Sequence, residues 1–241
     1  MNNLRGARVA ELPWNEMETR LAADATPVVT IGAGSKEHGH HLPLDTDLRQ
    51  TMWLGQAVAC RWPALVWPPI SYGHYPAFTQ YPGSDSVAAQ TFIETLEDVV
   101  MSIRAHTDTP ILFINTGIST IAPIEQVADD LKVTALHVHR GAHLVRTREQ
   151  HCTQNHGGHG DEGETALMCF IASDSVDISR AEANDQQLPR GNLSHDRTAP
   201  TYTPQGVWVR PDLGSATTGR ALATAMLANI ETTWDAMHAN H

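Results

Sequence analysis

The chain has 241 residues and a formal net charge of −11, from 16 basic and 27 acidic side chains. This excess of acidic residues disfavours a surface that binds phosphate backbones, so we expect a small-molecule substrate and no nucleic-acid partner. No linker divides the sequence, and its length suits one hydrophobic core, so residues 1–241 are predicted to form a single domain.

The cysteines and the apolar segments indicate a cellular compartment. Cys60, Cys152 and Cys169 are odd in number and lack CxxC spacing, which favours a reducing compartment over a disulfide framework. Residues 1–14 lack the continuous apolar run of a signal peptide, and no segment approaches the length of a membrane span. The sequence therefore predicts a cytoplasmic protein that does not enter a membrane.

The first half of the chain alternates short apolar runs with longer helical periodicity, which is typical of parallel strands linked by helices. Residues 27–34 are β-branched and end in glycines, so they are predicted to form a central strand. A helix is predicted over residues 54–62, followed by a strand over residues 64–70 that Pro68 and Pro69 stop. Residues 71–86, rich in Pro, Gly and aromatic side chains, are predicted to form a loop.

The middle of the chain repeats this alternation. Apolar spacing predicts a helix over residues 87–106, with Ser86 as its N-cap, and a buried strand over residues 111–115. The turn TGIST then opens a helix over residues 121–132. In the next strand, residues 133–141, alternation places Ala135, His137 and His139 on one face and Leu136 and Val138 on the other.

The last third contains two predicted helices around a polar segment. One helix begins with Glu164 in its first turn, and the other covers residues 218–237. Residues 173–206 are interpreted as a surface loop and a candidate lid that shapes the mouth of the pocket. Together these elements predict an α/β fold with a mainly parallel sheet flanked by helices.

Two segments concentrate metal-binding side chains. Residues 31–47, IGAGSKEHGHHLPLDTD, follow the predicted central strand, where active sites of α/β proteins are favoured. Residues 151–164, HCTQNHGGHGDEGE, form the second cluster about a hundred residues later. Imidazole nitrogens and carboxylate oxygens together suit zinc, manganese or iron, so we expect the fold to bring both segments to one catalytic metal.

Several motifs resemble the creatininase (creatinine amidohydrolase) family, in order and spacing over nearly the whole chain. GSKEHGHHLPLDTD is similar to the family's G-[ST]-x-E-Q-H-G-P-H-L-P-L-x-T-D signature, and PPISYGHYPAFTQYPGS to its P-x-x-x-Y-G-x-S…F-P-G-T segment. GHGDEGETALM resembles the H-A-G-x-x-E-T-S block, and GVWVRPDLGSATTGRAL the G-V-x-G-D-P…A-T-x-x-G-R ending. The resemblance implies a cytoplasmic, metal-dependent hydrolase of C–N bonds in cyclic or acyl amides, with a three-layer α/β fold and a hexameric homo-oligomer.

The resemblance carries over to particular residues. It maps the family's histidine ligand to His38, its bridging aspartate to Asp47, its catalytic histidine to His159 and its E-T glutamate to Glu164. The candidate metal ligands are therefore Glu37, His38, Asp47, His159 and Glu164, for one or two divalent ions (Zn, Mn or Fe) per chain. The candidate catalytic residues are His159, Glu164 and Glu37.

Two departures from the family pattern leave the number of ions open. The family's first glutamate ligand falls on Lys36, and a glutamate follows one position later as Glu37. Either the backbone shifts so that Glu37 supplies the oxygen, or that ligand is gone. After residues 111–115, NTGIST puts Gly117 and Ser119 where the family carries a histidine and a second ligand. Matched positions therefore indicate one ion, or a second ligand set drawn from residues 151–164.

A bound divalent ion would lower the pKa of a water molecule and polarise an amide carbonyl. His159 is then the candidate general acid for the departing nitrogen, and Glu37 or Glu164 the candidate base. Backbone amides of GHGD or NTGIST are candidate oxyanion donors. The alternative is a non-hydrolytic relative, metal-binding or metal-free, that supports another enzyme.

Simpler structural roles remain for many of these side chains. Glu164 also offsets a helix dipole, and Lys36 either pairs with a substrate anion or is solvated. Histidines whose roles as ligands stay open are His40, His41, His74, His137, His139 and His156. Trp62, Trp67 and Trp208 are interpreted as core or interface residues.

Overall fold

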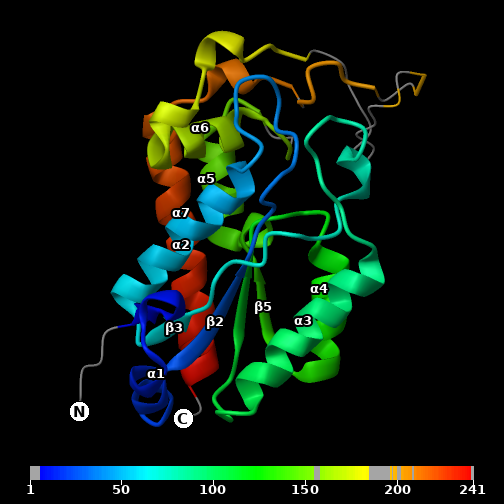
Figure 1. Ribbon diagram of the computed structural model, residues 1–241. Helices are drawn as coiled ribbons and strands as arrows, with labels where there is room; N and C mark the ends of the chain where they lie inside the picture. Colours follow the sequence, from blue (N-terminus) through cyan, green and yellow to red (C-terminus); the bar gives the residue numbers. More distant parts are fainter. Residues whose placement is uncertain are drawn as a thin grey trace.

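The centre of the fold is a parallel β-sheet, seen edge-on in the computed structural model of Figure 1. The structure describes residues 6–154, 158–184, 196, 198–199, 202–207 and 209–239. Within these residues the sheet has the strand order β1-β3-β2-β4-β5, and every neighbouring pair is parallel. The strands are β1 Ala7–Arg8, β2 Thr26–Ile31, β3 Ala64–Val66, β4 Leu112–Asn115 and β5 Thr134–His137.

Helices cover both faces of the sheet, giving three layers (Figure 1). One face packs against α2 (Thr46–Arg61), α5 (Ala142–His151), α6 (Glu162–Ile171) and α7 (Ala216–His238), and the other against α3 (Ala89–Arg104) and α4 (Ile121–Leu131). A short helix, α1 (Trp14–Leu21), precedes β2. The predicted α/β class with a parallel sheet and flanking helices is confirmed.

The alternation of β2 divides its apolar side chains between two cores. Val28 packs with the α2 and α7 layer, whereas Val29 and Ile31 pack with the α3 and α4 layer. All six residues of the strand are buried, as expected for a central strand covered on both faces. Ile31 pairs with Asn115 in register, so β2 and β4 end side by side and release their loops at the same edge.

Helix α6 is held close to α7 by a glycine. A Cβ atom at Gly219 would collide with the carbonyl group of Ala166, so only glycine permits this approach of the two helices. The close packing fixes the position of α6, whose N-terminal end lies at the same edge as the loop after β2.

Several local predictions were wrong in detail. The helix predicted from residue 54 begins at Thr46, and the cap of α3 is Ala88 rather than Ser86, whose hydroxyl instead accepts a hydrogen bond from the Tyr75 amide at 2.8 Å. Strand β5 ends at His137, and a 3₁₀ turn follows it. His139 therefore does not share a strand face with His137.

The polar segment 173–206 is not entirely a surface loop. Its described part contains two short 3₁₀ helices, Ser173–Ser175 and Ile178–Arg180, and the buried side chains of Asn184 and Thr203. No helix in the described part of the chain combines the length and apolar character needed to cross a membrane.

Candidate metal centre

The loop between β2 and α2, together with the first turn of α2, folds four charged or ionisable side chains inward. Lys36, Glu37, His38 and Asp47 are all buried, with exposed fractions of 5%, 7%, 0% and 1%. Gly39 makes the turn that allows this, with φ of 83°, and its amide donates to the Glu37 carboxylate. Because Asp47 lies in the first turn of α2, the helix dipole adds a favourable interaction with its charge.

Each carboxylate oxygen of Asp47 has its own partner, one an ammonium group and the other an imidazole ring. Lys36 Nζ lies 2.7 Å from Oδ2, and His38 Nε2 lies 3.2 Å from Oδ1. Burial works to raise the pKa of Asp47, but Lys36 and His38 outweigh it and hold that pKa below its usual range. Burial likewise works to lower the pKa of Lys36, and the Asp47, Glu164 and Glu37 carboxylates reverse the direction, so it is raised.

The N-terminus of α6 supplies the facing carboxylate. Asp161 is its N-cap and accepts a hydrogen bond from the Glu164 amide at 2.9 Å, while Arg148 donates to the other Asp161 oxygen at 2.5 Å. Glu164 accepts from the Gly160 amide at 2.6 Å and from Gln50 Nε2 at 3.4 Å. These bonds fix the direction of the Glu164 side chain.

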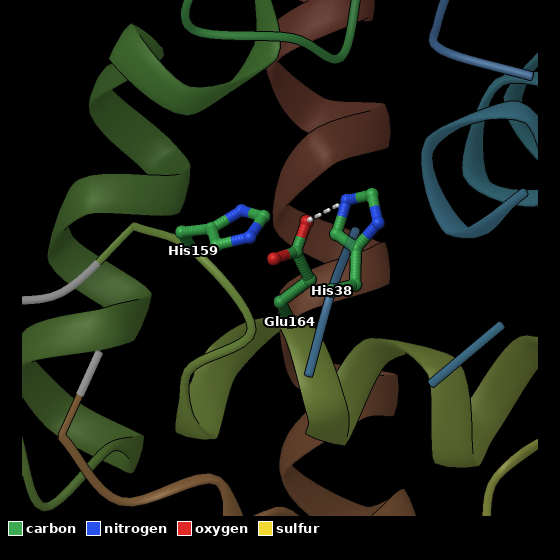
Figure 2. A group of neighbouring side chains, drawn as sticks. All are labelled: His38, His159 and Glu164. Carbon is green, nitrogen blue, oxygen red and sulfur yellow. Dashed lines mark ion pairs between the residues drawn. The ribbon is translucent and has the colours of Figure 1, made fainter. Parts of the chain in front are cut away.

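Three side chains converge from the two segments. His38, His159 and Glu164 are buried, and one ligand atom from each lies within 4.8 Å of the others. Figure 2 shows His38 and His159 on opposite sides of the Glu164 carboxylate, with the His38–Glu164 contact dashed. His38 Nε2 lies 3.7 Å from Glu164 Oε1. The expected meeting of residues 31–47 and 151–164 is therefore present in the fold.

The hydrogen bonding of His38 determines which of its nitrogens faces this group. Nδ1 lies 2.8 Å from the Lys36 carbonyl oxygen, which only accepts, so Nδ1 carries a proton. Nε2 then points at two carboxylate oxygens, of Asp47 and Glu164. A histidine held in this way by a backbone carbonyl is typical of a metal ligand.

His159 and Glu37 form a second pair beside the first. His159 Nε2 lies 2.9 Å from Glu37 Oε2, and the His159 ring packs against Phe78 with ring centroids 4.5 Å apart. The segment 202–207 covers this pair, because a side chain at Gly206 would meet the Glu37 carboxylate. Tyr81 holds that segment by donating from its hydroxyl to the Thr203 carbonyl at 2.8 Å.

A family model describing creatinine amidohydrolase, Creatininase, matches residues 10–233 of the chain. The chain belongs to the creatininase family. It is 27% identical to creatinine amidohydrolase of Pseudomonas putida over 194 residues. This match covers 71% of this chain and 74% of that protein. It is 26% identical over 223 residues to the mycofactocin precursor peptide peptidase of Mycobacterium ulcerans (strain Agy99), covering 83% and 82%.

Solved creatininase structures share the fold. A mutant creatininase described as Zn–Zn type has a TM-score of 0.80 at 22% identity, covering 96% of this chain and 98% of that one. The structure described as creatininase Mn has a TM-score of 0.76 at 23% identity, with the same coverage. The family resemblance that the motifs indicated is therefore confirmed.

In this creatininase-family chain, the turn after β4 contributes no metal-binding side chain to the converging group. Asn115 accepts from the Gly117 amide at 3.0 Å and from Thr120 Oγ1 at 2.9 Å, and its Nδ2 donates to the Gly117 carbonyl at 2.7 Å. Gly117 has no side chain that could bind a metal ion. Among the backbone amides of GHGD and NTGIST, which the sequence suggested as oxyanion donors, those of Gly117 and Gly160 already donate to the side chains of Asn115 and Glu164.

The remaining candidate histidines lie elsewhere. His40 is exposed, His41 bonds Thr165 Oγ1 at 2.7 Å, and His139 bonds the Thr116 carbonyl at 2.5 Å. His137 lies 3.0 Å from Asn115 Nδ2 and 3.7 Å from Glu125. His74 bonds the Val87 carbonyl at 3.0 Å. None of these belongs to the metal-like group found among the described residues, and His156 and Trp208 lie outside those residues.

Sequence reasoning missed two features of the centre. It treated Lys36 as solvated or substrate-binding, whereas Lys36 is buried against Asp47. It also missed Gln50, which contacts Glu164; its position three residues after Asp47, on the same face of α2, was the available signal. Trp62 was interpreted as core or interface, and it stacks on Trp234 with centroids 5.6 Å apart.

Proposed function

We propose that the chain is a metal-dependent amidohydrolase that cleaves a C–N amide bond in a small cyclic or formylated amide. The observation that carries the proposal is the environment of His38. Its Nδ1–H is fixed on the Lys36 carbonyl, which directs Nε2 towards the Asp47 and Glu164 oxygens. One ring nitrogen and two carboxylate oxygens that face one another in a buried space form a set of ligand atoms that suits a bound cation.

The donor set fits a divalent ion. His38, Asp47 and Glu164 would hold it through one nitrogen and carboxylate oxygens, which suits zinc, manganese or iron. His159 is close enough to be a further ligand. When bound, the ion would supply a water of lowered pKa and polarise the substrate carbonyl. Names of relatives support this choice, since solved creatininases are described in Zn–Zn and Mn forms.

Proton transfer would be handled by Glu37 and His159. Glu37 Oε2 is next to His159 Nε2, and both side chains are buried under residues 202–207. Glu37 would take the proton that leaves the attacking water, and His159 would give a proton to the nitrogen as the C–N bond breaks. Glu164 is less suited to the role of base, because its oxygens face His38, Gln50 and the Gly160 amide.

Metal content separates the two possible roles of His159. If His159 carries protons, His159→Gln lowers turnover about 10²–10⁴-fold and keeps the ion. His38→Ala, by comparison, lowers metal affinity at least about tenfold. Inductively coupled plasma mass spectrometry on both variants decides: loss of the ion from His159→Gln would make His159 a ligand instead of an acid.

The function itself is tested on protein purified without chelator or affinity metal. Metal content is measured for the native chain and for His38→Ala combined with Asp47→Ala, and hydrolysis is assayed on lactams, N-formyl amides and short peptides. We expect a divalent ion in the native chain only, with turnover that a chelator abolishes. A native chain that takes up no added ion, or that hydrolyses none of the three amide classes when loaded, contradicts the proposal.

The second candidate function, a non-hydrolytic relative, is favoured by one observation. The Lys36 ammonium already neutralises part of the Asp47 charge without a metal ion. A metal-free native chain would move the interpretation to this alternative. Under either function we retain a cytoplasmic location and a homo-oligomer, a hexamer by family resemblance, as expectations that fractionation and light scattering can test.

A further inference from the structure

The two carboxylate oxygens of Asp47 contact different side chains, one a histidine and the other a lysine. Its Oδ1 atom faces His38, on the side of the converging ligands, whereas its Oδ2 atom is 2.7 Å from Lys36 Nζ. A carboxylate that bridges two metal ions needs both oxygens free for them. Here one oxygen already has a cation, and a divalent ion on the same oxygen would be repelled by that ammonium at short range in a buried site.

The surroundings of Lys36 are suited to an ammonium and poor in metal ligands. Its Nζ atom lies 5.7 Å from the ring centroid of Tyr75 and 5.1 Å from that of Phe78. Burial raises the pKa of the Tyr75 phenol, which therefore stays neutral and is a weak ligand. A Cβ atom built on Gly117 would lie 3.8 Å from the Tyr75 ring. The turn after β4 therefore lies beside this aromatic ring and adds no side-chain metal ligand there.

The charges of the buried cluster formed by Lys36, Glu37, Asp47 and Glu164 also favour one divalent ion over two. Glu37, Asp47 and Glu164 carry three negative charges, and the Lys36 ammonium carries one positive charge. The difference is two negative charges, which is the charge that one divalent ion balances when the histidines are neutral. Two divalent ions would leave the buried cluster positive, at a high desolvation cost.

We propose that the Lys36 ammonium takes the place of a second divalent ion, so that the centre binds one ion per chain on the His38 side of Asp47. Lys36 is one of only two lysines in the sequence, and it supplies a fixed positive charge that no chelator removes. This inference rests on the proposed function, because it assumes that the His38 side holds an ion. It separates this chain from the neighbour described as Zn–Zn type.

The test is metal stoichiometry by equilibrium dialysis against Zn²⁺, and separately Mn²⁺, followed by inductively coupled plasma mass spectrometry. The native chain is expected to bind one equivalent. Lys36→Glu makes the cluster more negative by two charges and adds an oxygen ligand, so it is expected to bind a second equivalent. Lys132→Glu is the matched control, since Lys132 is exposed at the C-terminal end of α4 and its ammonium donates to the Asp129 carbonyl. This variant should still bind one equivalent.

The outcomes separate this inference from the proposed function. Two equivalents in the native chain would overturn the role of Lys36 and leave metal-dependent hydrolysis standing. No bound ion in the native chain would overturn both. A Lys36→Glu variant that is folded by circular dichroism and still binds one equivalent shows that Lys36 is not what excludes the second ion. If Lys36→Glu does not fold, Lys36→Met replaces it in the test, because this substitution removes the ammonium with little change in shape. A Lys36→Met variant that still binds a single equivalent at every Mn²⁺ concentration would then count against the inference.

Discussion

Strands β2 and β4 are parallel neighbours that end at the same edge of the sheet, yet the loops that follow them differ completely. After β2, the loop buries Lys36 and His38 in charged contacts with Asp47 in the first turn of α2. After β4, Asn115 and Thr120 form a neutral network of hydrogen bonds with the turn. These side chains are buried in both regions, so the difference between them lies in their chemistry.

This difference shows that the carboxyl end of a parallel strand does not by itself make a ligand set. In the neutral turn after β4, the Asn115 side chain is bonded to the backbone of the turn and is not directed at the converging group. The charged loop after β2 is incomplete without Glu164 of α6 and His159 of the segment just before it. The centre is therefore assembled between residues 31–47 and 151–164.

The largest effect is expected from Asp47→Asn, which leaves the Lys36 ammonium buried without its nearest counter-charge. We expect a loss of about 3–5 kcal/mol in the free energy of unfolding. Denaturant titration of chelated protein measures it. The double variant Lys36→Met with Asp47→Asn removes both charges and should recover much of the loss. If the double variant is as unstable as the single one, the ion pair does not explain the effect.

A smaller loss is expected from Asn115→Ala in the neutral loop. The substitution leaves the Gly117 amide and the Thr120 hydroxyl without their acceptor, at a cost of about 2–3 kcal/mol. Metal stoichiometry should not change, because Asn115 is not in the converging group. A lost ion in a folded Asn115→Ala variant would show that the two loops are not independent.

The pH dependence of stability should reveal His41, which joins the charged loop to Thr165. Burial lowers the pKa of His41 to about 4 from its ordinary 6.5, so the folded state prefers the neutral ring. This contribution is fully present above pH 6.5 and is lost as the pH falls towards 4, by about 3 kcal/mol at most. Chelated His41→Gln should lose less stability than the native chain over that range. Parallel stability curves for the two proteins would show that His41 does not titrate as proposed.

The fold was largely predictable because its strands are encoded locally. The β-branched run before Gly32 and the apolar run before Asn115 both form buried strands, and the periodicity of residues 87–106 forms α3. Helix α5 was not predicted, because its sequence is polar and only Leu144 is buried. The start of α2 was missed because residues near Asp47 resemble a ligand loop as strongly as a helix start.

The site was predictable in part. His38 and His159 follow from residue type and motif, and the structure brings them together with Glu164. The pairing of Lys36 with Asp47 was not predictable, because ten residues lie between them and their contact depends on the turn at Gly39. Long-range contacts such as His41 with Thr165 are likewise set by how α6 packs on α7.

The most direct test of the metal centre is anomalous X-ray diffraction from crystals of the zinc-loaded native chain. A single anomalous peak is expected at about 2.0–2.2 Å from His38 Nε2 and from a Glu164 oxygen. Lys36 Nζ should remain against Asp47 Oδ2. A second peak on the Lys36 side of Asp47, or a zinc peak placed away from His38, would contradict this expectation.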